Sequence, residues 1–474
     1  MSILKKLLLF YFILISPLLS NELPDLGEYS DSFLSDYQES LIAREILYQI
    51  HNSPDVVEDE EINDYLGYLG NRLVAHSDNP ERRFNFFVVK DLSINAFAML
   101  GGLIGVHTGL LISASNESEI ASVLSHEIAH VTQNHLQRVI AKQNRDQYKS
   151  LLLLAVGLLA ARSNPQLASG AMISSQAINV QNFLNYTREH EQEADNEGVK
   201  ILYKAGYNVG SSIDFFQVLQ KGSRFSTAAP SYLRTHPITT DRINSISNRI
   251  KDYPYRYFDE KSNFHFVRAK TRALYDKDAS EKVFEQNIKN QTYLNKEAEL
   301  YALVCILVKQ NKIDAAKTFF QQIKNIKNPF IDTLNIDILI QEKKYEEARG
   351  ILERKLKDYS NYRSFVYRLS DIYIKLNLNE KAKELLKLYL KKYVGDPSLY
   401  RLSAMVYKNE NQDLLYHENM GEYYYYKYDL KEAINQFGMA VKVKSDNDFY
   451  RKSRVEARLK QLQTESQFLN EQRK

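Results

Sequence analysis

Apolar residues recur at helical spacing over much of the chain, which predicts a mainly helical protein. Two early helices are expected at residues 41–50 and 60–74. A third is expected to begin after Asn116, because Asn116 can cap a helix start and Glu119, three residues later, completes a polar capping box. No proline or glycine interrupts this third segment until well past Ile140, and its apolar positions recur at Ile120, Val123, Leu124, Ile128 and Val131.

A short strand region is expected before this third helix. Residues 84–89 are rich in aromatic and β-branched side chains, which predicts a strand. The pair Gly101 and Gly102 separates residues 95–98 from the apolar residues 103–106. We therefore expect a hairpin or tight strand pair that turns at the two glycines.

From about residue 265 the chain becomes poor in glycine and rich in Lys, Glu, Leu and Tyr. Ala316, Ala348 and Ala382 open similar helical segments and lie 32 and 34 residues apart. That period is typical of tetratricopeptide helix pairs, in which a small residue lets two helices approach closely. The next matching alanine, Ala433, follows after 51 residues, so an irregular unit is expected there. A generic helical domain is the alternative.

Composition and charge exclude few classes of protein. The chain of 474 residues is 44% hydrophobic and 26% charged, which is ordinary globular usage. The net charge of +3 gives no sign of nucleic-acid binding. The single cysteine, Cys305, excludes an internal disulfide.

The first 20 residues predict a signal peptide. Lys5 and Lys6 precede an apolar run from residue 7 to residue 19, and cleavage is expected after Ser20, with an uncleaved anchor as the alternative. Export of a bacterial chain of this kind predicts a soluble periplasmic protein, because no other segment reaches the length of a membrane span. The apolar block at residues 151–161 predicts a buried core helix, or alternatively a lip beside the active site that contacts substrate or membrane.

Candidate chemistry lies within the third predicted helix, where residues 126–130 read His-Glu-Ile-Ala-His. Positions four apart share one face of a helix, so His126 and His130 can bind one metal ion. Glu127 is then within reach of the attacking water, which is the arrangement that a zinc peptidase requires. A surface helix with two incidental histidines is the alternative. His135 lies five residues after His130, off the ligand face, and is expected to be structural.

A catalytic zinc needs a third protein ligand, and the segment around residue 190 is the obvious donor. Spacing alone leaves Glu189, His190, Glu191 and Glu193 open, beside the alternative of a solvated acidic helix. Glu191 has one advantage, because Asp195 follows four residues later on the same helical face. There Asp195 can accept the free ring N–H of a ligand histidine and fix its tautomer.

These motifs together resemble the gluzincin peptidases of the HtpX and CAAX-prenyl-endopeptidase type. The resemblance covers roughly residues 60 to 250 and rests on Asn95-Ala96-Phe97-Ala98 with the two glycines, on the His-Glu-x-x-His motif, and on Glu191-Gln192-Glu193-Ala194-Asp195. It implies that Glu191 is the third metal ligand and that Asp195 supports the site. Leu100 departs from the proline that relatives often carry before the glycines, which affects the shape of a loop and not the metal.

The resemblance also identifies Arg234-Thr235-His236-Pro237, followed by Arg242. Pro237 favours an extended backbone at His236, so a loop or helix entrance is expected. In similar proteases this histidine approaches the zinc, where it displaces water in a resting enzyme or stabilises the oxyanion. His236 is therefore a catalytic candidate beside Glu127, and Arg242 is a supporting residue.

The expected fold is α+β and mainly α. A gluzincin-type metallopeptidase domain with a small β-sheet is followed by an α-solenoid of tetratricopeptide-like helix pairs. The expected division is a signal peptide (1–20), a helical lead-in (21–80), the peptidase domain (81–260) and the repeats (265–470).

The resemblance implies one Zn²⁺ per chain, held by His126, His130 and Glu191, with Glu127 as general base. An unfolded substrate is expected to add a strand along the edge formed by Asn95, Ala96, Phe97 and Ala98. For a secreted member that carries repeats, the resemblance implies a periplasmic endopeptidase for misfolded or stalled outer-membrane proteins that also assists their assembly. Its repeats would contact the β-barrel assembly machinery, and no nucleic-acid partner is expected. The alternative is a repeat-based chaperone or assembly scaffold with a silent or structural zinc site.

Overall fold

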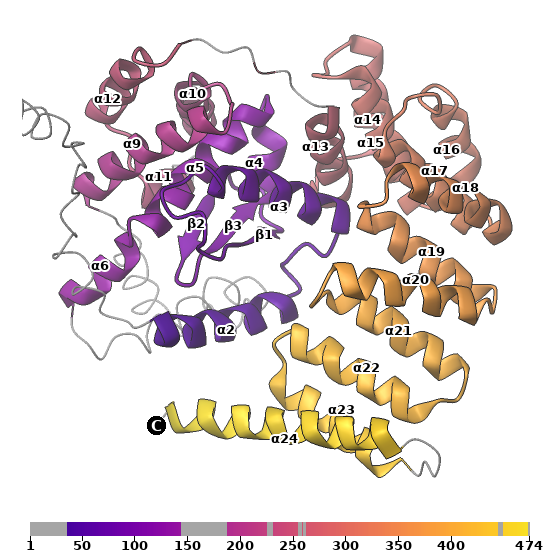
Figure 1. Cartoon of the computed structure of the whole chain (residues 1–474). Coiled ribbons are helices and arrows are strands. Elements are labelled where there is room, and N and C mark those ends of the chain that lie inside the picture. The colour runs from indigo at the N-terminus through magenta and orange to yellow at the C-terminus, as the bar shows by residue number, and fades with distance from the viewer. Residues whose placement is uncertain are drawn as a thin grey trace, which may run out of the picture.

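The computed structural model describes residues 36–143, 187–224, 231–254, 258, 262–443 and 449–472. The predicted signal peptide and the apolar block at residues 151–161 lie outside the described residues. Within them, an N-terminal domain with a small sheet is followed by a solenoid of helices, which curves along one side of that domain (Figure 1). The predicted α+β, mainly helical class is confirmed.

The sheet has three strands in the order β1-β3-β2. β1 (Asn85–Val89) runs parallel to β3 (Leu103–His107), and β2 (Ala96–Met99) pairs antiparallel with β3. The expected hairpin is present, and both Gly101 and Gly102 at its turn have a positive φ, of 76° and 70°. Strand β2 therefore lies at one edge of the sheet.

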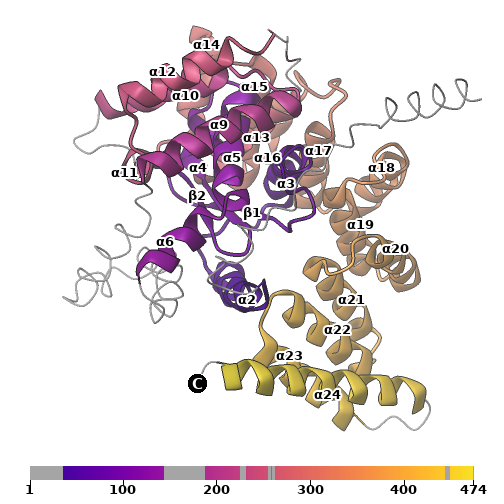
Figure 2. The same ribbon diagram turned by 60° about the vertical axis from the view of Figure 1, so that its left-hand side comes forward.

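Both faces of the sheet are buried, which explains why the strands show little alternation of polar and apolar residues. On one face, Phe87 and Phe97 pack in a core with α2 (Asp36–Asn52). On the other face, Val88 and Ala98 join a larger core with α3 (Glu60–Val74). Figure 2 shows α2 and α3 on opposite sides of the strands.

Helix α5 (Glu117–Thr132) carries the His-Glu-x-x-His motif and begins at the predicted cap. Asn116 Oδ1 accepts a hydrogen bond from the Glu119 backbone N–H at 3.0 Å. The helix does not continue past residue 140. It ends at Thr132, Asn134 adopts a left-handed conformation with φ of 52°, and α6 (His135–Gln143) starts in a new direction. Asparagine tolerates this conformation, so a break is possible without glycine or proline.

The remaining helices of this domain surround α5. Helix α9 (Arg188–Lys204) crosses it closely at Gly198, where an added Cβ would lie 3.2 Å from the His126 Cα. The small glycine thus sets the separation between the two helices. The other helices are α4 (Thr108–Ser113), α10 (Ser211–Arg224), α11 (Ser231–Thr235) and α12 (Thr240–Ile250).

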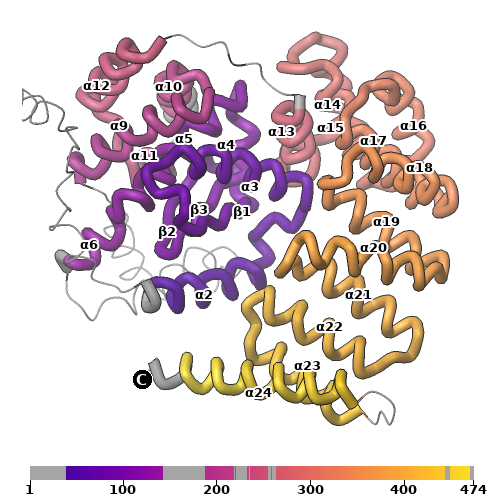
Figure 3. Tube along the Cα trace, in the orientation of Figure 1, coloured from indigo at the N-terminus to yellow at the C-terminus, as the bar shows by residue number. Residues whose placement is uncertain are grey.

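The solenoid consists of twelve helices in the described part of the chain, and Figure 3 traces them as successive antiparallel pairs. The alanines that mark the repeat, Ala316, Ala348, Ala382 and Ala433, are all fully buried. The helices are α13 (Ser262–Tyr275), α14 (Glu281–Asn290), α15 (Lys296–Lys309), α16 (Ile313–Phe320), α17 (Pro329–Gln341), α18 (Tyr345–Asp358), α19 (Arg363–Lys375), α20 (Asn379–Lys392), α21 (Pro397–Asn409), α22 (Asp413–Tyr426), α23 (Leu430–Lys442) and α24 (Phe449–Gln472).

The irregular step before Ala433 has a structural explanation. Each marker alanine follows, by five residues, a residue with a left-handed backbone at the preceding turn. The same turn recurs at Asn411, but Tyr416 takes the alanine position after it. Helix α22 instead has Gly421, where an added Cβ would meet Phe437 of α23 at 2.6 Å. The repeat therefore continues through α22, with the small residue at a different position.

The solenoid is fixed to the N-terminal domain at several places along its length, including ion pairs of Arg363 and Arg368 with α3. Lys270 of α13 pairs with the fully buried Glu61 of α3 at 2.5 Å, and one hydrophobic core runs without interruption across residue 265. At the other end, Glu465 of α24 pairs with Arg44 of α2. In the described ranges, every helix falls short of the length or apolar character needed to cross a bilayer.

Candidate metal centre

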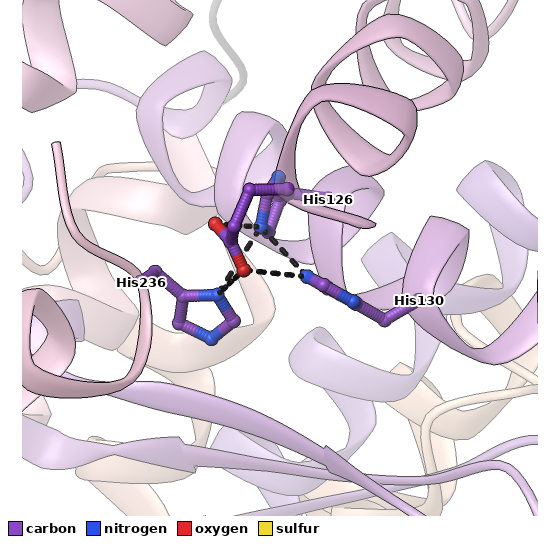
Figure 4. Close-up of side chains that lie close together, drawn as sticks. His126, His130 and His236 are labelled. Atoms are coloured by element: carbon purple, nitrogen blue, oxygen red, sulfur yellow. Dashed lines mark hydrogen bonds and ion pairs between the residues drawn. The ribbon is translucent and has the colours of Figure 1, made fainter. Parts of the chain in front are cut away.

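Four buried side chains from three parts of the fold converge on one point. His126 and His130 come from α5, Glu191 comes from α9, and His236 follows α11. One potential ligand atom from each lies within 4.8 Å of the others. Figure 4 shows the three imidazole rings turned toward one carboxylate, which belongs to Glu191.

The spacing of these atoms fits a tetrahedral zinc ion. Ligands about 2.0–2.1 Å from such an ion lie about 3.3 Å from one another. The two Nε2 atoms of His126 and His130 are 3.0 Å apart. Glu191 oxygens lie 3.6 Å from the His126 Nε2, 3.4 Å from the His130 Nε2 and 2.8 Å from the His236 Nδ1. Nitrogen and carboxylate lone pairs directed at one point form a donor set suited to a zinc ion.

Of the four candidates for the third ligand, the crossing of α9 over α5 brings Glu191 to the two histidines. Glu191, Asp195 and Gly198 share one face of α9, and Gly198 brings that face against His126. Glu189 is exposed, and Glu193 points to His135 instead, with 3.1 Å between its Oε2 and the His135 Nε2. His190 is buried and stacks on the His135 ring.

Asp195 and Arg242 contact the side chains of His126 and Glu191 on the side away from the ligand group. Asp195 Oδ1 lies 3.0 Å from the His126 Nδ1, the ring nitrogen that faces away from the ligand group. Arg242 donates to both Asp195 oxygens, at 2.7 and 2.8 Å, and also pairs with Glu191 at 2.7 Å. Burial alone would raise the pKa of Asp195, but the hydrogen bonds from Arg242 and His126 lower it below 3.8. The carboxylate therefore stays ionised.

Glu127 is fully buried beside the ligand group, with its Oε1 3.5 Å from the His236 Nε2. Burial raises the pKa of Glu127 above 4.5, against smaller opposing effects of His236, His126 and the Ala98 backbone. A raised pKa brings a carboxylate closer to the value at which it works best as a general base near neutral pH. By contrast, the charge of His236 and the hydrogen bonds from His126 and His130 outweigh burial and hold the pKa of Glu191 well below 4.5.

His236 is placed by α11 and by the edge of the sheet. Its backbone N–H donates to the Tyr232 carbonyl at 2.8 Å, just beyond the end of α11 and before Pro237. The Tyr232 ring stacks on its imidazole with 4.7 Å between centroids, and the Tyr232 N–H donates to the Ile94 carbonyl. The predicted edge lies beside this element: Ala96, Phe97 and Ala98 are in β2, and Asn95 precedes it.

Two supporting residues were missed in the sequence. Tyr232 and Gly198 carried no local signal, because their roles depend on which helices meet. His135, expected off the ligand face, does lie outside the ligand group, but a break in the helix brings its Nδ1 to 2.8 Å from the His130 Nδ1. The asparagine at position 134 is the signal that could have indicated the break.

The fold and site define a metallopeptidase of the His-Glu-x-x-His type, and comparison with known proteins gives the same class. Residues 61–250 match the model of peptidase family M48, and residues 339–406 match a tetratricopeptide repeat model. The chain therefore carries a peptidase family M48 domain followed by tetratricopeptide repeats, which confirms the predicted metallopeptidase and repeats.

Individual relatives match this chain over different lengths. The beta-barrel assembly-enhancing protease of Escherichia coli K12 is 27% identical over 407 residues, which cover 83% of this chain and 82% of that protein. A provisionally named protein of the same kind from Vibrio cholerae is 34% identical over 305 residues, covering 64% of this chain and 63% of that one. The mitochondrial metalloendopeptidase OMA1 of Schizosaccharomyces pombe is 25% identical over 182 residues, or 38% of this chain and 51% of its own.

Proposed function

We propose that this chain is a zinc-dependent endopeptidase of the bacterial periplasm that degrades misfolded or stalled outer-membrane proteins and assists their assembly. The observation that carries the proposal is the convergence of His126, His130 and Glu191 beside the buried Glu127. The names of the E. coli and V. cholerae relatives support a role in β-barrel assembly. The signal peptide predicted at residues 1–20 supports export.

One zinc ion per chain would be held by His126, His130 and Glu191. When bound, zinc would supply Lewis acidity toward the attacking water and the scissile carbonyl. Glu127 accepts the proton of that water and returns it to the leaving amine. Its burial and its position next to the ligand group suit both transfers.

His236 has two candidate roles at this site. The Nδ1 of His236 belongs to the ligand group, which supports a resting state in which this histidine takes the fourth position. Its movement would then admit water and substrate. Stabilisation of the oxyanion during turnover is the alternative role, and it requires His236 to leave the Glu191 carboxylate.

An extended substrate would lie along β2, the edge strand next to the site. Backbone pairing with an edge strand tolerates many sequences, which suits unfolded clients. The repeats would contribute a second contact, with the β-barrel assembly machinery. A scaffold without catalysis is the competing function, but Glu127, the ligands and the supporting Asp195 and Arg242 are all in place.

The decisive experiment compares Glu127→Gln with the parent protein. Glu127→Gln should retain one zinc per chain and the parent's helical content, but lose cleavage of casein and of an unfolded outer-membrane β-barrel by several orders of magnitude, since only the base is removed. Glu119→Gln is the matched control, because the same change at the start of α5 keeps the helix cap and should keep activity. Cleavage by Glu127→Gln at the parent's rate, or a parent protein without zinc, would overturn the proposal.

A further inference from the structure

The two ligand histidines of α5 are supported by different kinds of group. The outer nitrogen of His126 meets a carboxylate, Asp195, at 3.0 Å. The outer nitrogen of His130 meets another imidazole, with its Nδ1 2.8 Å from the Nδ1 of His135. Ligand histidines usually donate this outer N–H to a carboxylate, a backbone carbonyl or water. A neutral histidine can accept this N–H on one ring nitrogen only if its own proton lies on the other ring nitrogen.

The surroundings of His135 fix that arrangement. His130 directs Nε2 at the ligand group, so its proton lies on Nδ1 and is donated to the His135 Nδ1. The proton of His135 then lies on Nε2, which is 3.1 Å from Glu193 Oε2. Arg138 holds the same carboxylate oxygen at 2.5 Å. The hydrogen bonds thus run in one direction, from His130 through His135 to Glu193.

Packing restricts the orientation of the His135 ring. The side chain of His135 is fully buried, and the His190 ring stacks on it with 4.6 Å between centroids and 20° between planes. His190 and Glu193 both belong to α9, the helix that also provides Glu191. Helix α9 therefore supplies the candidate ligand Glu191, the residue Asp195 that contacts His126, and the two residues that contact His135.

The helix break at Asn134 brings His135 to this position. On a continuous helix, a residue five positions after His130 would lie about 140° around the axis from it. The left-handed residue Asn134 redirects the chain instead. Arg82 stabilises the break by donating to the Val131 carbonyl at 2.9 Å and to Asn134 Oδ1 at 2.7 Å, and it is itself paired with the buried Glu39 at 2.7 Å.

We infer that His135, held by Glu193, is a positioning residue that fixes the tautomer and ring orientation of the metal ligand His130. The inference rests on the proposed function, because it assigns a role toward the zinc ion. It predicts that the loss of the acceptor at position 135 weakens metal binding, even though His135 is not itself a ligand.

The test measures zinc affinity by competition with a chromophoric chelator, using the full-length protein. His135→Leu removes the acceptor of the His130 N–H, so zinc should bind about 10–100-fold more weakly. His135→Asn places an amide oxygen close to the Nδ1 position and should stay within a few-fold of the parent. His417→Leu in α22 changes a histidine far along the solenoid, bonded to Gln436, and should leave zinc affinity unchanged.

If the role of His135 were purely structural, the Leu and Asn variants would rank in the opposite order. A leucine fills an apolar cavity better than an asparagine, so the Asn variant would then be the more damaged of the two. Two substitutions of the half-exposed Glu193 provide a second comparison, which leaves the core unaltered. Glu193→Met should weaken zinc binding several-fold, whereas Glu193→Gln, which keeps an acceptor, should not.

The outcomes separate this inference from the proposed function. A parent protein that binds no zinc and cleaves no casein refutes the proposed function. A parent that binds zinc and cleaves casein, with His135→Leu and Glu193→Met binding zinc as tightly as the parent, refutes only the role of His135.

Discussion

The Nε2 atom of His236 lies 3.5 Å from the Glu127 Oε1, while the Nδ1 of the same ring lies in the ligand group. One imidazole thus contacts both the candidate base and the candidate ligands. In this arrangement the His236 ring lies between the Glu127 Oε1 and the Glu191 Oε1. We propose that this geometry represents a closed form of the site.

If His236 closes the site, its removal should increase basal proteolysis. We expect His236→Ala to retain zinc through His126, His130 and Glu191 and to cleave casein several-fold faster than the parent. Initial cleavage rates and zinc content would be measured together, with His417→Ala as a control in the solenoid. A lower rate with zinc retained would instead show that His236 stabilises the transition state.

The pH dependence of cleavage should reflect the ionisation of the Glu127 carboxyl. The base must be ionised, and burial raises its pKa above 4.5, so kcat/KM should fall as the pH drops through a midpoint above 4.5. The pKa values of Glu191 and Asp195 are lowered, so these carboxylates stay ionised in that range.

Stability should behave differently from activity over the same pH range. A raised carboxyl pKa contributes stability at low pH that is lost as the pH rises through the folded-state value, so protonation of Glu127 does not itself unfold the protein. Circular dichroism at each pH would confirm that the fold persists while activity declines. An acid midpoint at or below 4.5 would contradict the assignment of Glu127 as the base.

Glu61 and Lys270 form a buried ion pair at the junction between the domains. Lys270→Met should destabilise the protein by about 3–5 kcal/mol, because it leaves a fully buried carboxylate without its cation. Adding Glu61→Gln should recover part of that loss. Urea denaturation followed by circular dichroism would measure both, with the exposed Lys289→Met of α14 as a control expected to change stability by less than about 0.5 kcal/mol.

The pH dependence of the Lys270→Met variant gives a further check. Burial raises the pKa of Glu61, and loss of Lys270 should raise it further. Stability gained from a raised carboxyl pKa is present at low pH and lost as the pH rises, so the defect should be smaller at pH 5 than at pH 8. A defect that does not change with pH would show that the pair is not the cause.

Two glycines of adjacent helices should respond in opposite ways to alanine. Gly421→Ala should destabilise the last repeats by about 1–3 kcal/mol, since its Cβ would lie 2.6 Å from the ring of the buried Phe437. Gly438→Ala meets no atom within 4 Å and should stabilise α23 by about 0.5–1 kcal/mol. Equal effects in thermal unfolding would show that Gly421 does not set the contact between α22 and α23.

Local patterns predicted the helical elements well. The expected helix at residues 60–74 matches α3, and the cap at Asn116 starts α5 as expected. The same patterns missed the continuation of the repeat through α22, because the small residue moves from the alanine position to Gly421. Period alone does not reveal such a shift, since the partner that requires the small residue, Phe437, comes from another helix.

The sequence by itself determined the class of chemistry, because a spacing of four residues on a helix places His126 and His130 on one face whatever surrounds them. Glu127 follows from the same local geometry. Only the tertiary structure decided which acid faces these histidines, where His236 lies and what supports His130. Those choices depend on how α9 crosses α5 at Gly198 and on how Asn134 redirects the chain. The helix crossing is a contact between segments far apart in the sequence, and the turn at Asn134 is one that many sequences permit. No local pattern therefore specifies either of them.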